Sequence, residues 1–416
     1  MIKTAGIIAE YNPFHRGHEY QIEETRRRTG ADFILVVMSG NFVQRGEPAI
    51  FEKSQRARMA LLCGADLVLE LPAAYATGSA EDFACGAVSL LHGLGCIDYL
   101  SFGSEAGDLT PLQEAAAMLA GESPRFSCLL REGLRQGLPF PRARSMALEG
   151  CGLSAGALEA AASANNLLGI EYLKALARLS SPIQPMTIRR EGRGYHDPCL
   201  PDSRSDFASA SAIRKAADLS AGPFPPEILA QIPPALHKLY HSGSLLPLSA
   251  NDCSALLQYQ LLTCLLEEIP LERFSDFSPE LAQRLKEDAF RAASFQERAA
   301  YLKTRQYTYT RISRCLTHLL LNITAQDMLR LREEGYPAYA RILGFKKSAA
   351  PLLKEIKEKA SIPLISKAAH GPGMLSGSLL ALWNQEIYAS HIYHALLQQK
   401  YNSNPQNEYS RPIVIL

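Results

Sequence analysis

Short apolar runs alternate with segments of helical periodicity over the first hundred residues. The apolar runs predict buried strands, and apolar positions three or four residues apart between them predict helices. This alternation is typical of βαβ units, whose right-handed crossovers place every strand-to-helix loop at one edge of a parallel sheet, where ligands bind. The predicted strands are Lys3–Ala9, Phe33–Met38, Leu67–Leu71 and Tyr99–Phe102, and the predicted helices are Gly17–Arg28, Glu52–Cys63 and Ala80–His92.

The rest of the chain contains a helical stretch, a returning strand and a second domain. Residues 110–180 have helical periodicity, Gln184–Arg189 predicts a strand, and the polar residues 191–206 predict a long loop. The Pro-rich stretch Pro223–Pro234 marks a linker. We therefore predict an α/β domain at 1–222, a linker at 223–244 and a mainly helical domain at 245–416. Helices in that last domain are predicted at Cys253–Leu266, Tyr309–Leu321, Ala349–Glu358 and Gln385–Gln399.

Composition is typical of a globular protein with more than one domain. The chain has 416 residues, of which 47% are hydrophobic and 20% charged, enough apolar material for packed cores. No secretory signal is evident, and the apolar window at 65–76 is interrupted by Asp66, Glu70 and Pro72 before it reaches the length of a membrane span. We expect a cytoplasmic protein that does not enter a membrane. Its oligomeric state does not follow from the pattern.

The nine cysteines are scattered singly, with no CxxC pair that could begin a zinc site or a redox dithiol. An isolated His196–Asp197 pair lies in the predicted long loop without a second pair of ligands nearby. We therefore predict no protein-held metal.

Charge is unevenly distributed although the formal net charge is only +1. Between Arg298 and Lys367 there are 14 Lys and Arg residues against 5 Asp and Glu residues. A local excess of this kind can bind a polyanion even when the average charge is near zero. The second half of the chain is therefore the expected nucleic-acid-binding region.

A histidine pair begins the first predicted helix. His15 and His18 lie three residues apart, directly after the first strand, so both rings occupy one face of the first helical turn. Free backbone N–H groups and the positive end of the helix dipole make that turn an anion site, and Gly17 leaves room for a phosphate. A short HxxH can also be a chance pair on a solvated turn, but its position between strand and helix favours a catalytic role. The predicted reaction is cleavage of ATP between the α and β phosphates, in which the two imidazoles would act as donors held where negative charge develops.

The element is similar to the HxGH signature of the nucleotidylyltransferase superfamily. Over a wider span the chain resembles the bacterial tRNA(Met) cytidine acetate ligase family more closely than the small adenylyltransferases. The segments that carry the resemblance are Gly6–His18, Met38–Ala49, Phe102–Glu105, Asn165–Tyr172 and Ser209–Arg214, which span most of the first 220 residues.

The resemblance implies a Rossmann-like parallel-sheet nucleotidylyltransferase domain at 1–222 and a two-step reaction. Acetate attacks the α-phosphorus of ATP to give acetyl-adenylate, and the wobble cytidine of elongator tRNA(Met) then takes the acetyl group to become N(4)-acetylcytidine. A cytosine amine is a poor nucleophile, so activation of the carboxylate is chemically reasonable. Mg²⁺ would accompany ATP, held mainly by phosphates and water.

The resemblance also implies the nucleotide site. The catalytic residues would be His15 and His18. Gly103 would let the adenosine approach the backbone, and Ser209, Ser211 and Arg214 would bind the β and γ phosphates. The full set implied to bind ATP is Ile7, Ile8, Ala9, Glu10, Tyr11, Asn12, Pro13, Phe14, His15, Arg16, Gly17, His18, Glu19, Tyr20, Gly103, Asn165, Arg189, Arg190, Ser209, Ser211 and Arg214.

Several of these positions have a structural alternative. Gly103 could form a tight turn after a strand, and one arginine of the pair at 189–190 could simply be solvated. Asn165 could be a helix N-cap, with Asn166 as an equal candidate for the nucleotide contact. Ser209 could likewise be only a cap.

The acetate pocket is expected on the loop after the second strand. Gln44 and Arg45 lie there, with Lys53 at the start of the next helix as a further candidate. A plain β-turn is the alternative for Gln44 and Arg45, and a solvated side chain is the alternative for Lys53.

Aromatic and cationic residues alternate from Tyr301 to Arg314. Cations neutralise phosphates and tyrosines stack on unpaired bases, the combination used on single-stranded RNA loops. An amphipathic helix with a solvated basic face is the alternative. The expected tRNA contacts are Lys303, Arg305, Arg311, Arg314, Lys346 and Lys347.

Two other functions remain open from the sequence. A cofactor-forming adenylyltransferase would join AMP to a small phosphate ester, but such enzymes are much shorter than this chain. A non-catalytic RNA-binding protein could retain a degenerate nucleotide fold, although His15, Gly17 and His18 are all present.

Overall fold

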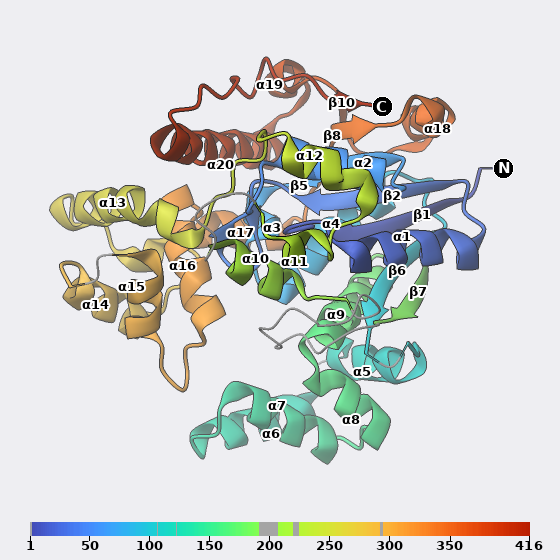
Figure 1. The fold of residues 1–416 in the computed structure, drawn as a ribbon. Coiled ribbons are helices and arrows are strands. Elements are labelled where there is room, and N and C mark those ends of the chain that lie inside the picture. The colour runs from blue at the N-terminus through green and yellow to red at the C-terminus, as the bar shows by residue number, and fades with distance from the viewer. Residues whose placement is uncertain (1, 106, 122, 191–206, 219–223, 292–293) are drawn as a thin grey trace.

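A mixed sheet forms the centre of the protein. The computed structural model describes residues 2–105, 107–121, 123–190, 207–218, 224–291 and 294–416, so the predicted loop at 191–206 lies outside the described residues. The strand order is β10-β8-β5-β2-β1-β6-β7, and all neighbouring pairs from β5 to β7 are parallel (Figure 1). These strands are β1 (Thr4–Ala9), β2 (Phe33–Ser39), β5 (Leu67–Leu71), β6 (Tyr99–Ser104), β7 (Gln184–Arg189), β8 (Ala340–Phe345) and β10 (Val414–Ile415).

Helices cover both faces of the sheet, as the alternation of strands and helices predicts. Within β2, Ile34 and Val36 pack into one core while Leu35 and Val37 pack into the other, because successive side chains point to opposite faces. The first core is closed by α1 (Arg16–Thr29), α2 (Lys53–Leu62), α10 (Ala210–Asp218), α11 (Pro226–Leu229) and α12 (His237–His241). The second is closed on the sheet by α3 (Ala73–Ala76), α4 (Ala80–Gly93), α5 (Thr110–Ala120) and α9 (Ala164–Arg178).

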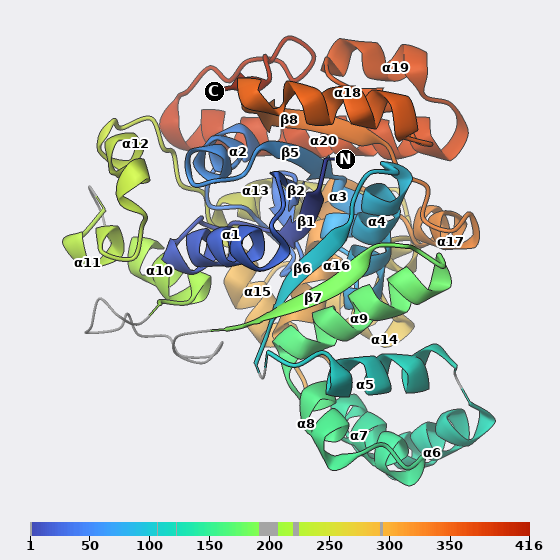
Figure 2. The ribbon, with the colours of Figure 1, turned by 90° about the vertical axis from the view of Figure 1, so that its right-hand side faces the viewer.

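Three further helices form a lobe that extends from α5 and α9 away from the sheet. Figure 2 shows this lobe below β7, at the opposite side of the molecule from the C-terminal helices. The lobe accounts for the helical periodicity of residues 110–180, together with α5 and α9. Its helices are α6 (Pro124–Arg135), α7 (Phe140–Gly150) and α8 (Ala155–Ala162).

The second half of the chain is mainly helical, as predicted, but it also completes the sheet. Strand β8 pairs antiparallel with β5, and β10 and β9 (Leu364–Ile365) both pair with β8. The division at residue 245 stays a prediction, since the sheet crosses it. The helices of this half are α13 (Ser254–Leu266), α14 (Pro279–Asp288), α15 (Phe295–Leu302), α16 (Tyr309–Leu321), α17 (Ala325–Glu333), α18 (Ala350–Lys359), α19 (Gly371–Met374) and α20 (Gly377–Tyr401).

The elements predicted from periodicity are present with small shifts at their ends. The largest difference is α20, which begins at Gly377 although helical periodicity placed its start at Gln385. A two-stranded hairpin, β3 (Phe42–Val43) and β4 (Glu47–Pro48), follows β2. None of the described helices has the length and apolarity needed to span a membrane.

Candidate active site

The two histidines of the HxGH element cap the helix that they begin. His15 is the N-cap of α1, and its Nδ1 accepts a hydrogen bond from the backbone N–H of Gly17 at 3.1 Å. The Nδ1 of His18 accepts one from the backbone N–H of His15 at 3.3 Å. The two rings stack with centroids 3.8 Å apart. Both side chains are therefore fixed by the backbone of the turn that carries them.

These contacts decide which nitrogen of each ring can donate. Because Nδ1 accepts in both rings, the neutral imidazoles carry their proton on Nε2. Burial lowers the pKa of His15 to about 3, aided by the guanidinium groups of Arg190 and Arg214. Burial, together with His15 and Arg190, also lowers the pKa of His18 well below its ordinary value. The free protein thus presents two neutral N–H donors at physiological pH.

Acidification should destabilise the protein through His15. Its pKa is about 3 when folded and about 6.5 when unfolded, so the unfolded state binds more protons over this interval and stability falls as pH falls below 6.5. In His15→Asn the amide oxygen can still cap the helix, but the side chain does not titrate. Between pH 7 and pH 5 we therefore expect the unfolding free energy of the parent to fall by on the order of 1–2 kcal/mol more than that of His15→Asn. Urea unfolding at both pH values measures this difference, and identical pH dependence in the two proteins would contradict a neutral buried His15.

Gly17 is required by the packing of the first histidine. A Cβ at this position would lie 3.0 Å from Cε1 and 3.1 Å from Nδ1 of His15. A side chain at this position would require the imidazole to move by a few tenths of an ångström from its capping position. The glycine of the HxGH element therefore holds His15 in place as well as leaving backbone accessible.

Two buried aromatic side chains support the second histidine. Tyr11 and Phe14 are fully buried, and their rings pack edge to face with centroids 4.7 Å apart. The ring of His18 lies 4.8 Å from that of Tyr11 and 5.5 Å from that of Phe14. The apolar residues before the helix thus fix the orientation of His18.

Helix α10 reaches the same turn through Arg214. The guanidinium of Arg214 donates to the backbone oxygen of Asn12 at 2.6 Å and lies 3.2 Å from the Glu47 carboxylate. Ser209 Oγ accepts from the backbone N–H of Ala212 at 3.1 Å, so Ser209 caps α10. Ser211 is half-buried in the first turn of that helix. The structure therefore brings the predicted phosphate-binding segment beside His15. It also shows the hydrogen bond by which Ser209 caps the helix, which was the structural alternative for this residue.

The end of β6 and the end of β7 form the other side of the site. The backbone N–H of Arg190 donates to Ser104 at 2.9 Å, and a Cβ on Gly103 would lie 3.1 Å from Cγ of Arg190. The Arg190 side chain thus runs across Gly103 toward the histidines, whose pKa values it lowers. Arg189 is exposed at the last position of β7.

The two asparagines of α9 differ in position. Asn165 is in the first turn, and the N-cap position that it was considered for is occupied by Ser163. Asn166 is buried, and its Oδ1 accepts from the backbone N–H of Glu105 at 3.0 Å. Asn166 therefore fixes the loop after β6.

Glu10 connects the β3–β4 hairpin to the site. Its carboxylate accepts from the backbone N–H of Gln44 at 2.8 Å. Burial raises the pKa of Glu10, opposed by the Gln44 N–H and by the guanidinium groups of Arg214 and Arg45. Gln44 and Arg45 are thus held beside Glu10, at the carboxyl end of β1.

Lys53 is enclosed by the protein. Its side chain is 1% exposed, and its ammonium lies 2.6 Å from Glu70, 2.6 Å from Glu408 and 3.3 Å from Glu386. The alternative of a solvated side chain is therefore wrong, and a contact between Lys53 and acetate stays a prediction. Burial raises the pKa of Glu386, and the adjacent Glu70 adds to the effect.

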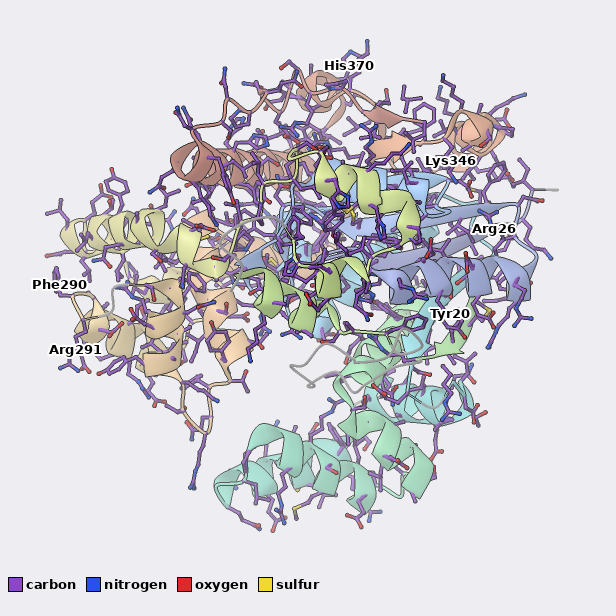
Figure 3. The ribbon with its side chains drawn as sticks, in the orientation of Figure 1. Tyr20, Arg26, Phe290, Arg291, Lys346 and His370 are labelled. Carbon is purple, nitrogen blue, oxygen red and sulfur yellow. The ribbon has the colours of Figure 1, made fainter. Side chains whose placement is uncertain are left out.

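The expected tRNA contacts fall into two separate groups. Lys303 and Arg305 are exposed just before α16, and Arg311 and Arg314 lie in its first turns, with Arg314 2.9 Å from Asp276. Lys346 and Lys347 instead follow β8 at the other edge of the sheet. The backbone N–H of Lys346 donates to Asp66, just before β5 begins, because β8 runs antiparallel to β5. Figure 3 shows Lys346 beside the outer end of β8.

Arg56 is a supporting residue that the sequence did not reveal. Its guanidinium is fully buried and donates to the backbone oxygens of Phe51, Gly40 and Glu10, the last at 2.6 Å. Helix α2 contains two arginines, Arg56 and Arg58, and nothing in the local pattern shows that Arg56 is the enclosed one, so only the fold identifies it. Among the described residues, no group of three His, Cys, Asp or Glu side chains could hold a metal ion.

Known proteins are similar to this chain in both sequence and structure. A family model described as HIGH Nucleotidyl Transferase matches residues 2–409. A protein of Acetivibrio thermocellus named tRNA(Met) cytidine acetate ligase is 39% identical over the whole of both chains. One with the same name from Caldanaerobacter subterraneus is 38% identical over 94% of this chain and 95% of its own. A crystal structure of Thermotoga maritima TmcAL bound with alpha-thio ATP has a TM-score of 0.88 at 28% identity, over the whole of both chains.

Proposed function

The chain belongs to the tRNA(Met) cytidine acetate ligase family of HIGH nucleotidyl transferases, and we propose that it uses ATP and acetate to form N(4)-acetylcytidine at the wobble position of elongator tRNA(Met). The observation that carries this proposal is the pair of neutral, backbone-fixed imidazoles at the start of α1. Such donors suit a reaction in which charge develops on phosphate oxygens. The tRNA substrate implies a cytoplasmic site of action.

In the first step, a carboxylate oxygen of acetate forms a bond to the α-phosphorus while the bond to the bridging oxygen breaks. Pyrophosphate leaves with the electron pair of that bond, and acetyl-adenylate remains. Negative charge grows on the non-bridging oxygens and on the pyrophosphate, so the Nε2–H groups of His15 and His18 bind the transition state more strongly than the substrate.

The nucleotide would lie along residues 7–20, with its phosphates between two arginines. Arg190 and Arg214 come from opposite sides of the site, and both guanidinium groups act on His15. Their positions support the proposal that they bind the triphosphate, together with Ser209 and Ser211 at the start of α10. Gly103 and Asn165 would contact the adenosine. Mg²⁺ would be held by the phosphates and water, which supply the oxygen ligands it prefers.

Acetate would bind near Gln44 and Arg45, beside Glu10. An arginine guanidinium suits a small carboxylate. Lys53 is not part of this proposal, since its charge is neutralised inside the protein.

In the second step, the N4 amine of the wobble cytidine attacks the acetyl carbonyl. A C–N bond forms, the bond between acetyl carbon and phosphate oxygen breaks, AMP leaves with that electron pair, and the amine loses one proton to water. Lys303, Arg305, Arg311 and Arg314 would neutralise phosphates of the anticodon arm from α16 and the segment before it.

Incubation with ATP, labelled acetate and total tRNA is expected to place the label in N(4)-acetylcytidine, with one pyrophosphate released per acetyl-adenylate formed. Nucleoside analysis by mass spectrometry detects the product. Omission of acetate should abolish pyrophosphate release. Adenylylation of a small phosphate ester without acetylation of cytidine would identify an adenylyltransferase instead, and no pyrophosphate under any condition would identify a non-catalytic RNA-binding protein.

A further inference from the structure

Helix α16 is hydrogen-bonded to the β3–β4 hairpin at Gly46. The hydroxyls of Ser313 and Thr317 both donate to the backbone oxygen of Gly46, each at 2.7 Å. Gly46 has φ of +73°, and a Cβ there would lie 2.3 Å from the backbone nitrogen of Arg314. The backbones of helix and hairpin therefore touch, and this contact fixes α16 relative to the nucleotide site.

The same face of α16 carries Tyr309 one turn nearer the site. Thr317, Ser313 and Tyr309 are spaced four residues apart, so they form one stripe along the helix. The stripe passes Gly46 and continues toward the next hairpin residue, Glu47. Burial and the nearby Glu47 carboxylate raise the pKa of Tyr309, and 37% of this residue remains exposed.

Glu47, the carboxylate near Tyr309, is itself linked to the catalytic turn. Glu47 lies 3.2 Å from Arg214, and Arg214 donates to the backbone oxygen of Asn12 at 2.6 Å, three residues before His15. The half-exposed phenol ring is thus at the rim of the proposed nucleotide site. Three cations are close to Tyr309 in the chain: Lys303 and Arg305 precede it and are exposed, and Arg311 follows it, with its guanidinium 5.1 Å from the Tyr307 ring.

An acceptor cytosine must leave the stack of the anticodon loop before its amine can reach an acetyl group. Unstacked bases are commonly received by aromatic side chains flanked by cations. We propose that Tyr309 is the platform on which the acceptor cytosine stacks, and that it thereby positions the N4 amine toward acetyl-adenylate. This role rests on the proposed function and concerns only its second step, so Tyr309 is a positioning residue and takes no part in the chemistry at phosphorus.

The test compares Tyr309→Ala and Tyr309→Phe in the full-length protein. Two rates are measured: acetate-dependent exchange of labelled pyrophosphate into ATP, which reports the first step, and single-turnover transfer of labelled acetyl from preformed acetyl-adenylate to tRNA(Met). Tyr309→Ala is expected to slow transfer by roughly 5- to 150-fold, the range given by loss of one base–aromatic stack, with exchange close to that of the parent. Tyr309→Phe keeps the ring and should transfer within about threefold of the parent.

Tyr388→Ala is the matched control. Tyr388 is 40% exposed, close to the 37% of Tyr309, and it lies on α20, outside the segment proposed to bind tRNA. Its transfer rate should be unchanged. Parent-like transfer in Tyr309→Ala would overturn the proposal, and so would equal losses in Tyr309→Ala and Tyr309→Phe, which would assign the effect to the hydroxyl. Absence of acetate-dependent exchange in the parent would instead overturn the proposed function.

Discussion

His18→Ala is expected to lower the rate of acetyl-adenylate formation by about a hundred- to thousandfold, equivalent to roughly 2.7–4 kcal/mol of transition-state stabilisation. The physical reason is that Nε2–H of His18 is a neutral donor whose orientation is already fixed by its Nδ1 contact with the backbone N–H of His15. No reorganisation is needed when charge develops on the phosphate. Acetate-dependent pyrophosphate exchange measures the rate, and a filter-binding assay with tRNA(Met) should show affinity close to that of the parent.

His370→Ala is a suitable control for this substitution. His370 is exposed at the top of the view in Figure 3, apart from α1, and its removal should leave exchange and tRNA binding unchanged. An equal loss of exchange and of tRNA affinity in His18→Ala would show that His18 supports the fold of the turn. Exchange at the parent rate would remove His18 from the catalytic residues.

Lys53→Met is expected to reduce the unfolding free energy by about 3–5 kcal/mol. The substitution keeps an unbranched side chain only one atom shorter but leaves Glu70, Glu386 and Glu408 around an uncharged group in the interior. Arg341 lies 2.9 Å from Glu70 and 2.6 Å from Glu408 and can neutralise only part of the remaining charge. Burying a carboxylate without a partner lowers the free energy of unfolding by far more than the intact ion pair raises it.

Urea unfolding monitored by tryptophan fluorescence measures this loss directly. Trp383 is the single tryptophan of the chain, it is fully buried, and Arg341 of the cluster lies 5.1 Å from its ring. The double variant Lys53→Met with Glu408→Gln should recover part of the lost stability, because the charge of Glu408 is then removed together with the cation that it faces. Lys359→Met, which breaks an exposed pair with Glu355, should leave the unfolding free energy close to that of the parent. A similarly small loss for Lys53→Met would show that water reaches the cluster.

The amino-acid sequence determined the parts of this protein that depend on neighbouring residues. Short apolar runs and the helical periodicity between them predicted the order of strands and helices around β1, β2 and β5, because each element must bury its own apolar residues. The histidine pair was evident for the same reason. His15 and His18 bond to the turn that they occupy, so their geometry follows from a span of only four residues.

Tertiary structure alone decided the contacts between distant segments. Lys53 is enclosed by carboxylates from β5, α20 and the C-terminal segment, so its helix-start position gave no sign of its burial. Strand β8 joins the sheet antiparallel, which sends Lys346 to the edge opposite the site. The backbone oxygen of Gly46 accepts from Ser313, 267 positions along the chain, and this contact holds the helix that carries Tyr309 against the β3–β4 hairpin. Local patterns determine which faces must be buried, but packing over the whole chain determines which segments meet. That packing decides whether a charged residue such as Lys53 or Lys346 is buried or lies at the surface.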